Sequence, residues 1–214
     1  MAQTDPYRRI ARVYDLFVEP MQSGVRQAGL RLVPPEPGWR VLDIGCGTGT
    51  GLTPYVDAGC TVAGVEVSAA MLDKAIARIG DRAELHLTDG SALPFEEATF
   101  DLVMTSMVVH ELPLEARPGF VAEMGRVARP EGCIVITDFH FGPLRGWRGP
   151  LSRAASTVLE RMSGHYSGYR SFRASGGVPT MVAATGMRIE AEKLVAGGNI
   201  GLYVVRPDSA AGDE

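Results

Sequence analysis

The sequence predicts an α/β fold with a mostly parallel sheet, and three observations support this prediction. An apolar run from Val41 to Ile44 is typical of a buried strand, and the glycines Gly45, Gly47 and Gly49 follow it directly. Strand-like and helix-like stretches then alternate to about residue 139, which favours parallel strands with right-handed crossovers. Near the end, two β-compatible runs flank a Gly-Gly-Asn turn, as in an antiparallel hairpin.

The bulk properties fit one globular domain, 1–214. The chain has 214 residues and a net charge of −4, which argues against a nucleic-acid partner because that would require a basic surface. Three cysteines without metal-ligand spacing fit a reducing compartment and predict no metal site. We see no signal peptide and no apolar run of membrane-spanning length, so we expect a cytoplasmic protein. The sequence leaves the oligomeric state open between a monomer and a homodimer.

Two helices are expected before the sheet, in an N-terminal segment 1–33. Residues 5–18 carry apolar side chains at helical spacing, including Tyr7 and Tyr14, and a second helix is expected over 23–32. Three prolines between residues 34 and 37 then require an extended link to the first strand.

The core 36–139 is expected to hold five strands and three helices. Strands are predicted at 41–44, 61–66, 83–87, 100–105 and 133–139. Helices are predicted at 50–57, at 69–78 with Ser68 as N-cap, and from about Pro118 to a turn at Pro130-Glu131-Gly132.

The alternating pattern then stops. A helix is predicted around 151–162 and another near 173–184, so that residues 140–179 form an inserted helical cap or lid. The C-terminal region 180–206 carries the hairpin, with strands at 187–195 and 200–206. Together these elements predict a Rossmann-like, doubly wound sheet with flanking helices and a helical cap.

The glycine spacing distinguishes between two kinds of ligand. A dinucleotide fingerprint needs its third glycine three residues after the second, and that position holds Thr50 or Leu52 in the two possible registers. The observed pattern is D-x-G-x-G-x-G, with Asp43 two residues before the first glycine. A carboxylate there suits an ammonium group better than a pyrophosphate.

The string VLDIGCGTG resembles the first motif of class I S-adenosylmethionine (SAM) methyltransferases. In that family the last strand enters antiparallel between the fifth and sixth, which matches the predicted hairpin. The string YRRIARVYDLF resembles the ubiquinone/menaquinone-biosynthesis branch and phospholipid-type relatives. The resemblance implies a SAM-dependent methyltransferase that acts on a small, partly apolar or lipid-like molecule and releases S-adenosylhomocysteine. A nicotinamide-dependent oxidoreductase and a non-catalytic SAM-binding partner protein are the alternatives.

Several residues are expected to hold the cofactor. Glu66 ends the second predicted strand, and a carboxylate there can bind a ribose diol. By resemblance, Asp89 accepts the adenine amino group and Met71 packs on the ring. Ser106 and Met107 leave the fourth predicted strand at the carboxyl edge of the sheet, where backbone carbonyls can hold the ammonium, and Thr105 is the other candidate. Tyr14 is a candidate to cover the sulfonium. The full predicted set is Tyr14, Asp43, Gly45, Cys46, Gly47, Gly49, Glu66, Val67, Met71, Asp89, Gly90 and Ser106.

A catalytic base is needed only if the acceptor must lose a proton, because the cofactor is already activated. His110 is the candidate, since it follows the fourth predicted strand and histidine titrates near neutral pH. His140 and His165 are competitors. The cap mixes aromatic residues with arginines, so we expect it to cover an amphiphilic acceptor, and transient membrane contact is possible. The alternative is a packed cap whose arginines face solvent.

Overall fold

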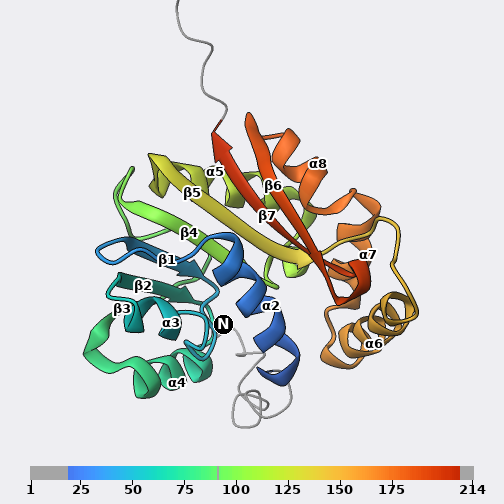
Figure 1. Cartoon of the computed structure of the whole chain (residues 1–214), viewed down its shortest axis with the longest axis horizontal. Coiled ribbons are helices and arrows are strands. Elements are labelled where there is room, and N and C mark those ends of the chain that lie inside the picture. Colours follow the sequence, from blue (N-terminus) through green and yellow to red (C-terminus); the bar gives the residue numbers. More distant parts are fainter. Residues whose placement is uncertain (1–18, 91, 208–214) are drawn as a thin grey trace, which may run out of the picture.

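The computed structural model describes residues 19–90 and 92–207. A seven-stranded sheet with the order β3-β2-β1-β4-β5-β7-β6 forms its centre (Figure 1). The parallel strands are β1 (Arg40–Ile44), β2 (Thr61–Glu66), β3 (Ala83–Leu87), β4 (Phe100–Ser106) and β5 (Ala128–Phe139). The hairpin strands β6 (Met187–Val195) and β7 (Ile200–Pro207) complete the sheet, and β7 pairs antiparallel with both β5 and β6. The predicted topology is therefore confirmed.

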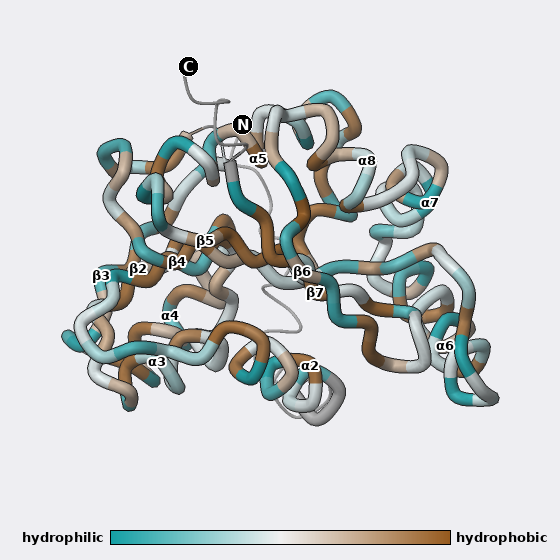
Figure 2. Tube along the Cα trace, turned by 45° about the horizontal axis from the view of Figure 1, so that its top comes forward, coloured by the Kyte–Doolittle hydropathy of each residue, from teal (hydrophilic) through white to brown (hydrophobic). Residues whose placement is uncertain are grey.

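Helices cover both faces of the sheet (Figure 2). On one side lie α2 (Glu19–Leu32), α3 (Thr53–Asp57) and α4 (Ala69–Ile79), and on the other lie α5 (Arg117–Val127) and α8 (Gly177–Ala183). Side chains alternate between the two layers, so Val41 joins the core under α3 and its neighbour Leu42 joins the core under α5. The cap helices α6 (Arg148–Ser163) and α7 (Tyr166–Ala174) lie at the β6–β7 end.

Several predicted boundaries match the structure because local signals fix them. Ser68 caps α4, and its side chain accepts a hydrogen bond from the Met71 amide. Strands β2, β3 and β6 have the predicted bounds. The helix predicted over 5–18, with Tyr7 and Tyr14, lies outside the described residues.

Two predictions were wrong in detail. The turn expected at 130–132 is instead an irregular part of β5. Phe100 of β4 pairs with Ala128 and Leu102 pairs with Cys133, so the register between β4 and β5 shifts across this part. The single helix expected at 173–184 is instead two helices, α7 and α8. They are separated by Gly176 and Gly177, whose φ angles of 87° and 70° are incompatible with a continuous α-helix.

Candidate cofactor site

The glycine turn after β1 is fixed by backbone contacts with β2. The amides of Gly45 and Cys46 both donate to the Val65 carbonyl, at 2.8 and 3.1 Å. Gly45, Gly47 and Gly49 all have positive φ, but their surroundings differ. A Cβ at Gly45 would overlap Val108, and one at Gly49 would lie 2.9 Å from the Ile79 side chain. Among the described residues, a Cβ at Gly47 would meet no atom within 4 Å outside its chain neighbours, so the backbone of Gly47 is open to a ligand.

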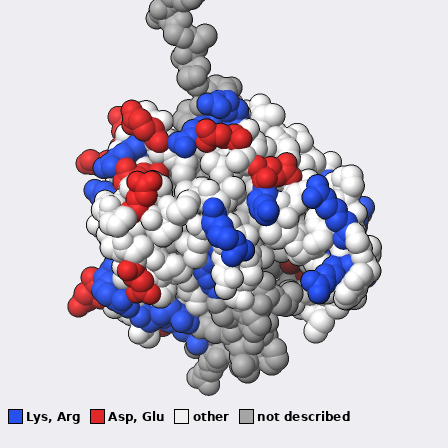
Figure 3. All heavy atoms as spheres, in the orientation of Figure 1, with Lys and Arg blue, Asp and Glu red and all other residues white. Residues whose placement is uncertain are grey.

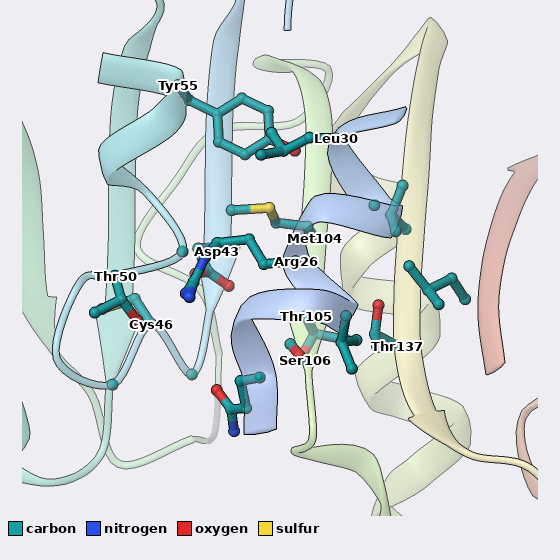
Figure 4. A pocket seen from close by; sticks show the side chains of 18 of the residues that line it. Arg26, Leu30, Asp43, Cys46, Thr50, Tyr55, Met104, Thr105, Ser106 and Thr137 are labelled. Carbon is teal, nitrogen blue, oxygen red and sulfur yellow. The ribbon is translucent and has the colours of Figure 1, made fainter. Parts of the chain in front are cut away.

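Two cavities meet at this turn and share Gly45, Gly47 and Ser106. The smaller one, of about 120 Å³, lies between α2 and the carboxyl ends of β1, β4 and β5 (Figure 4). The larger one, of about 850 Å³, follows the ends of β2 and β4 toward α5. A ligand that spans the glycine turn would therefore have one end in each cavity, at the sheet edge where α/β proteins bind ligands.

The smaller cavity is lined by the buried carboxyl group of Asp43 and by the guanidinium group of Arg26. Burial, followed by the charge of Glu66, raises the pKa of Asp43 to about 7, whereas the charge of Arg26 opposes this shift. Figure 4 shows Arg26 extending from α2 toward Asp43. Both residues line the cavity. This pair suits an amino-acid zwitterion, with the ammonium near the carboxylate and the carboxylate near the guanidinium.

The larger cavity begins at Glu66, whose carboxylate is rigidly held. Oε2 accepts from the Gly47 amide at 2.8 Å, and Oε1 accepts from the amides of Val67 and Ser68, both at 2.9 Å. Burial raises the pKa of Glu66, and these three amides oppose the shift. A carboxylate offers about four lone-pair positions, so one remains for a ligand hydroxyl. Glu66 therefore both braces the turn and can bind a ribose.

Ten of the twelve predicted cofactor residues line one or both cavities. The exceptions are Gly49, which packs on α4, and Tyr14, which lies outside the described residues. The structure adds Arg26 in the smaller cavity, and Glu111 and Phe120 in the larger one. No local motif marks these three, because only the tertiary fold brings α2, the turn after β4 and α5 to the glycine turn.

His110 does not fit the predicted role of base. Only 1% of its surface is exposed, and it lines neither cavity. Its amide donates to Asp138 Oδ2 at 3.0 Å, Nδ1 lies 2.8 Å from Oδ1, and Nε2 lies 3.6 Å from Glu160 Oε2. Burial alone would lower the pKa of His110, but the two carboxylates outweigh it and raise the pKa to about 10. A histidine that is already protonated cannot accept a proton at neutral pH.

A second buried cation completes this charged cluster. Arg117, at the start of α5, donates to the carbonyls of Leu112 and Gly168 and lies over the Phe172 ring. With His110, Asp138 and Glu160 it joins β5 and α5 to the cap helices. His140 is bound elsewhere, with Nδ1 2.8 Å from the Tyr203 hydroxyl. In the described chain no group of three His, Cys, Asp or Glu side chains is arranged to hold a metal ion.

A doubly wound sheet with an inserted antiparallel strand, an acid before its glycine turn and an acid after β2 defines the class I SAM-dependent methyltransferase architecture. Residues 41–132 match a family model described as a methyltransferase domain. The chain is 34% identical over 174 residues to a demethylmenaquinone methyltransferase of Renibacterium salmoninarum, covering 75% of this chain and 70% of the relative. The chain therefore belongs to the SAM-dependent methyltransferase family, and its sequence is similar to those of relatives named for quinone biosynthesis.

Other comparisons agree with this assignment. A malonyl-[acyl-carrier protein] O-methyltransferase of Erwinia pyrifoliae is 34% identical over 175 residues, covering 74% of this chain and 63% of that relative. A methyltransferase of Haloferax volcanii, solved with a methyltransferase activator, superimposes with a TM-score of 0.71 at 16% identity and covers 95% of this chain and 96% of that one. That structure supports the fold. The comparisons lend no support to an oxidoreductase or a non-catalytic binding protein.

Proposed function

We propose that this enzyme methylates a small, partly apolar or lipid-like molecule, of the kind named for its relatives. One observation carries the proposal: the larger cavity does not end at the nucleoside residues. Beyond Ser106 it continues along Met107, Val108, Leu112 and Phe120, which form an apolar wall. Its volume of about 850 Å³ lies in the upper part of the range for small-molecule pockets. An apolar acceptor beside the nucleoside is therefore well accommodated.

The residues that would hold SAM follow from the two cavities. Asp43 and Arg26 bind the amino-acid end, Glu66 binds the ribose, and Met71 and Asp89 lie where the adenine is expected. When bound, SAM supplies an activated methyl group, and the protein positions the two reactants and excludes water.

In this proposal His110 is a positioning residue rather than a base. Its contacts with Asp138 and Glu160 fix the turn that carries Glu111. Glu111 lines the larger cavity, and its Oε1 lies 2.9 Å from His165 Nδ1. For an acceptor that must lose a proton, Glu111 backed by His165 is placed to receive it. Glu111→Gln should remove the rising limb of the pH–rate profile, whereas His110→Asn should only shift that limb along the pH axis, because His110 Nε2 lies 3.9 Å from Glu111 Oε1. This pair of results would support the division of roles.

We also propose that segment 140–179 acts as a lid over the acceptor. Phe141, Tyr169 and Phe172 of this segment form a continuous aromatic cluster with Phe139 at the end of β5, with neighbouring rings 4.9–6.5 Å apart. Backbone amides of 140–179 should exchange more slowly when S-adenosylhomocysteine and a true acceptor are both present. Unchanged exchange would refute the lid.

Titration calorimetry and a product assay test the function itself. Wild type should bind SAM and release S-adenosylhomocysteine with a demethylated quinol or a malonyl thioester as acceptor. Glu66→Ala should weaken SAM binding by roughly 1.5–3 kcal/mol, the scale of hydrogen bonds to a charged group. Since Glu66 also braces the turn, thermal unfolding of the same variant must be measured. No product with any acceptor of these classes would contradict the proposal.

A further inference from the structure

Helix α6 buries its polar face, whereas an ordinary surface helix buries its apolar face. Ser156 and Glu160 are buried, and Asn199 Nδ2 donates to the hydroxyls of Ser152 and Ser156 at 3.2 and 3.0 Å. Arg153 donates to the His140 carbonyl at 2.7 Å. Polar contacts thus attach α6 to the protein, whereas amphipathic helices normally dock through their apolar stripe.

The outer face of α6 is apolar. Five of the nine large hydrophobic residues exposed in the described chain belong to α6 and its N-cap: Trp147, Leu151, Val158, Leu159 and Met162. Trp147 is 73% exposed and Met162 81%. At 100° per residue, all five fall within one third of the helix circumference, opposite Ser156 and Glu160. They form one continuous stripe, here called the α6 stripe, rather than scattered single residues.

The charge around this stripe has one sign. Residues 140–186 contain six arginines, no lysine, and one acid, Glu160, which is buried against His110, although the whole chain has a net charge of −4. Arg145, Arg148, Arg161, Arg170 and Arg173 are exposed. Figure 3 shows basic side chains over the cap, whereas acidic and basic side chains are intermixed on the opposite side of that view.

We infer that α6 is an interfacial helix that lies on an anionic lipid surface, with the α6 stripe in the acyl boundary and the surrounding arginines at the phosphates. Apolar residues on one face with exposed arginines around them define such helices, and anionic headgroups supply the complementary charge. The 16-residue helix, about 24 Å long, lies at the edge of the molecule, where it can reach a flat surface (Figure 1). This inference goes beyond the proposed function, because it requires neither a particular acceptor nor turnover.

Flotation of the full chain with vesicles tests the surface directly. Vesicles of phosphatidylcholine with phosphatidylglycerol should carry the protein upward, and phosphatidylcholine alone should carry much less. Leu151→Gln with Met162→Gln should reduce the bound fraction about tenfold. Ile76→Gln with Leu87→Gln is the matched control, since these residues are 48% and 57% exposed on α4 and β3. Equal loss in both double variants would overturn the inference.

Charge-reversal variants measure how much the arginines around the α6 stripe contribute to vesicle binding. Arg145→Glu with Arg148→Glu should abolish flotation, whereas Arg31→Glu with Arg188→Glu changes the net charge equally and should have little effect. Each arginine near an anionic surface contributes about fivefold, equivalent to ~1 kcal/mol. Added salt should weaken binding of wild type. Identical behaviour of the two reversal variants would contradict the assignment.

Tryptophan emission reports on the helix itself. The chain has two tryptophans, so Trp39→Phe leaves Trp147 as the only emitter. Vesicles should shift its emission to the blue and brominated lipid should quench it. Unchanged emission would refute insertion. A dimer in the absence of vesicles, dissociated by Leu151→Gln with Met162→Gln, would assign the α6 stripe to a second copy and would also overturn the proposal.

Discussion

The glycine-turn region and the cap are stabilised by different kinds of buried contact. Around the turn, apolar side chains such as Val41 and Leu52 are buried, and backbone amides fix the Glu66 carboxylate. At the base of the cap, Glu160 of α6 is buried against His110 of the turn after β4, and the α6 stripe faces outward. Backbone amides hold the buried Glu66 carboxylate of the first region, whereas charged side chains, Asp138 and Glu160, hold the buried His110 of the second. Variants should therefore damage the two regions in different ways.

The largest effect should come from breaking the buried charge cluster. Asp138→Ala removes the carboxylate nearest to protonated His110 and the acceptor of the Phe139 amide. We expect a loss of about 3–5 kcal/mol in the free energy of unfolding, as for removal of one partner of a buried pair. Denaturant titration measures it. The exposed pair Glu190–Arg206 is the control, and Glu190→Ala should cost less than about 1 kcal/mol.

The same cluster predicts a pH dependence with a definite sign. The folded-state pKa of His110 is about 10, above its usual 6.5, so the native state binds the extra proton. The stabilisation is complete below pH 6.5 and is lost as pH rises through 10. Wild type should lose stability over that interval, and His110→Gln should remove this component of the loss. Parallel curves for the two proteins would show that His110 does not retain its proton.

The next largest effect should come from a substitution in the glycine turn and should lower the affinity for SAM. Gly47→Ala forces a non-glycine residue into positive φ at ~1–2 kcal/mol and places a methyl group where the two cavities meet. SAM affinity should fall at least about tenfold by calorimetry. Gly24→Ala, on α2 with open space around it, is the control and should leave affinity unchanged. An equal loss in both variants would exclude Gly47 from the site.

A smaller effect should follow pH in the same region. Asp43 ionises near pH 7, and its charged form attracts an ammonium group. SAM affinity should therefore rise between pH 6 and pH 8, at most about tenfold per pH unit. Asp43→Asn should flatten this profile. A slope that persists in Asp43→Asn would place the titrating group elsewhere.

The smallest effect should be on local stability alone. Ser68→Ala removes the N-cap contact to the Met71 amide and should cost about 1 kcal/mol. Ser68→Thr should restore part of the loss, because threonine also caps helices and adds no charge beside the buried Glu66 carboxylate. Thermal unfolding measures both. A loss as large as that of Asp138→Ala would remove the contrast between the two regions.

The sequence predicted the sheet, and ten of the twelve expected cofactor residues line the two cavities, because short-range patterns determine these features. The strand before Gly45, the acid at Glu66 and the cap at Ser68 each depend on neighbours within a few positions. Arg26 was missed because α2 reaches Asp43 only through the tertiary fold. The buried contacts of His110 could not be predicted for the same reason, since Asp138 and Glu160 lie 28 and 50 residues further along the chain.

The cap shows a second limit of sequence patterns. The apolar periodicity of residues 151–162 correctly predicted a helix, but periodicity does not say which face turns inward. Contacts of Ser156 with Asn199 and of Glu160 with His110 determine which face is buried, and both partners belong to distant elements. Among the described residues no helix has both the length and the apolar character to cross a bilayer.

The strand order also has a consequence for synthesis on the ribosome. Strand β7 lies between β5 and β6, although it is made after both of them. Until residues 200–207 emerge, β5 has an open edge and β6 has no strand to pair with. The glycine turn and its five parallel strands can assemble earlier, but they carry an unpaired edge that is prone to aggregation in nascent chains. Chaperones that bind exposed strand edges should therefore protect this enzyme mainly in the interval before β7 appears.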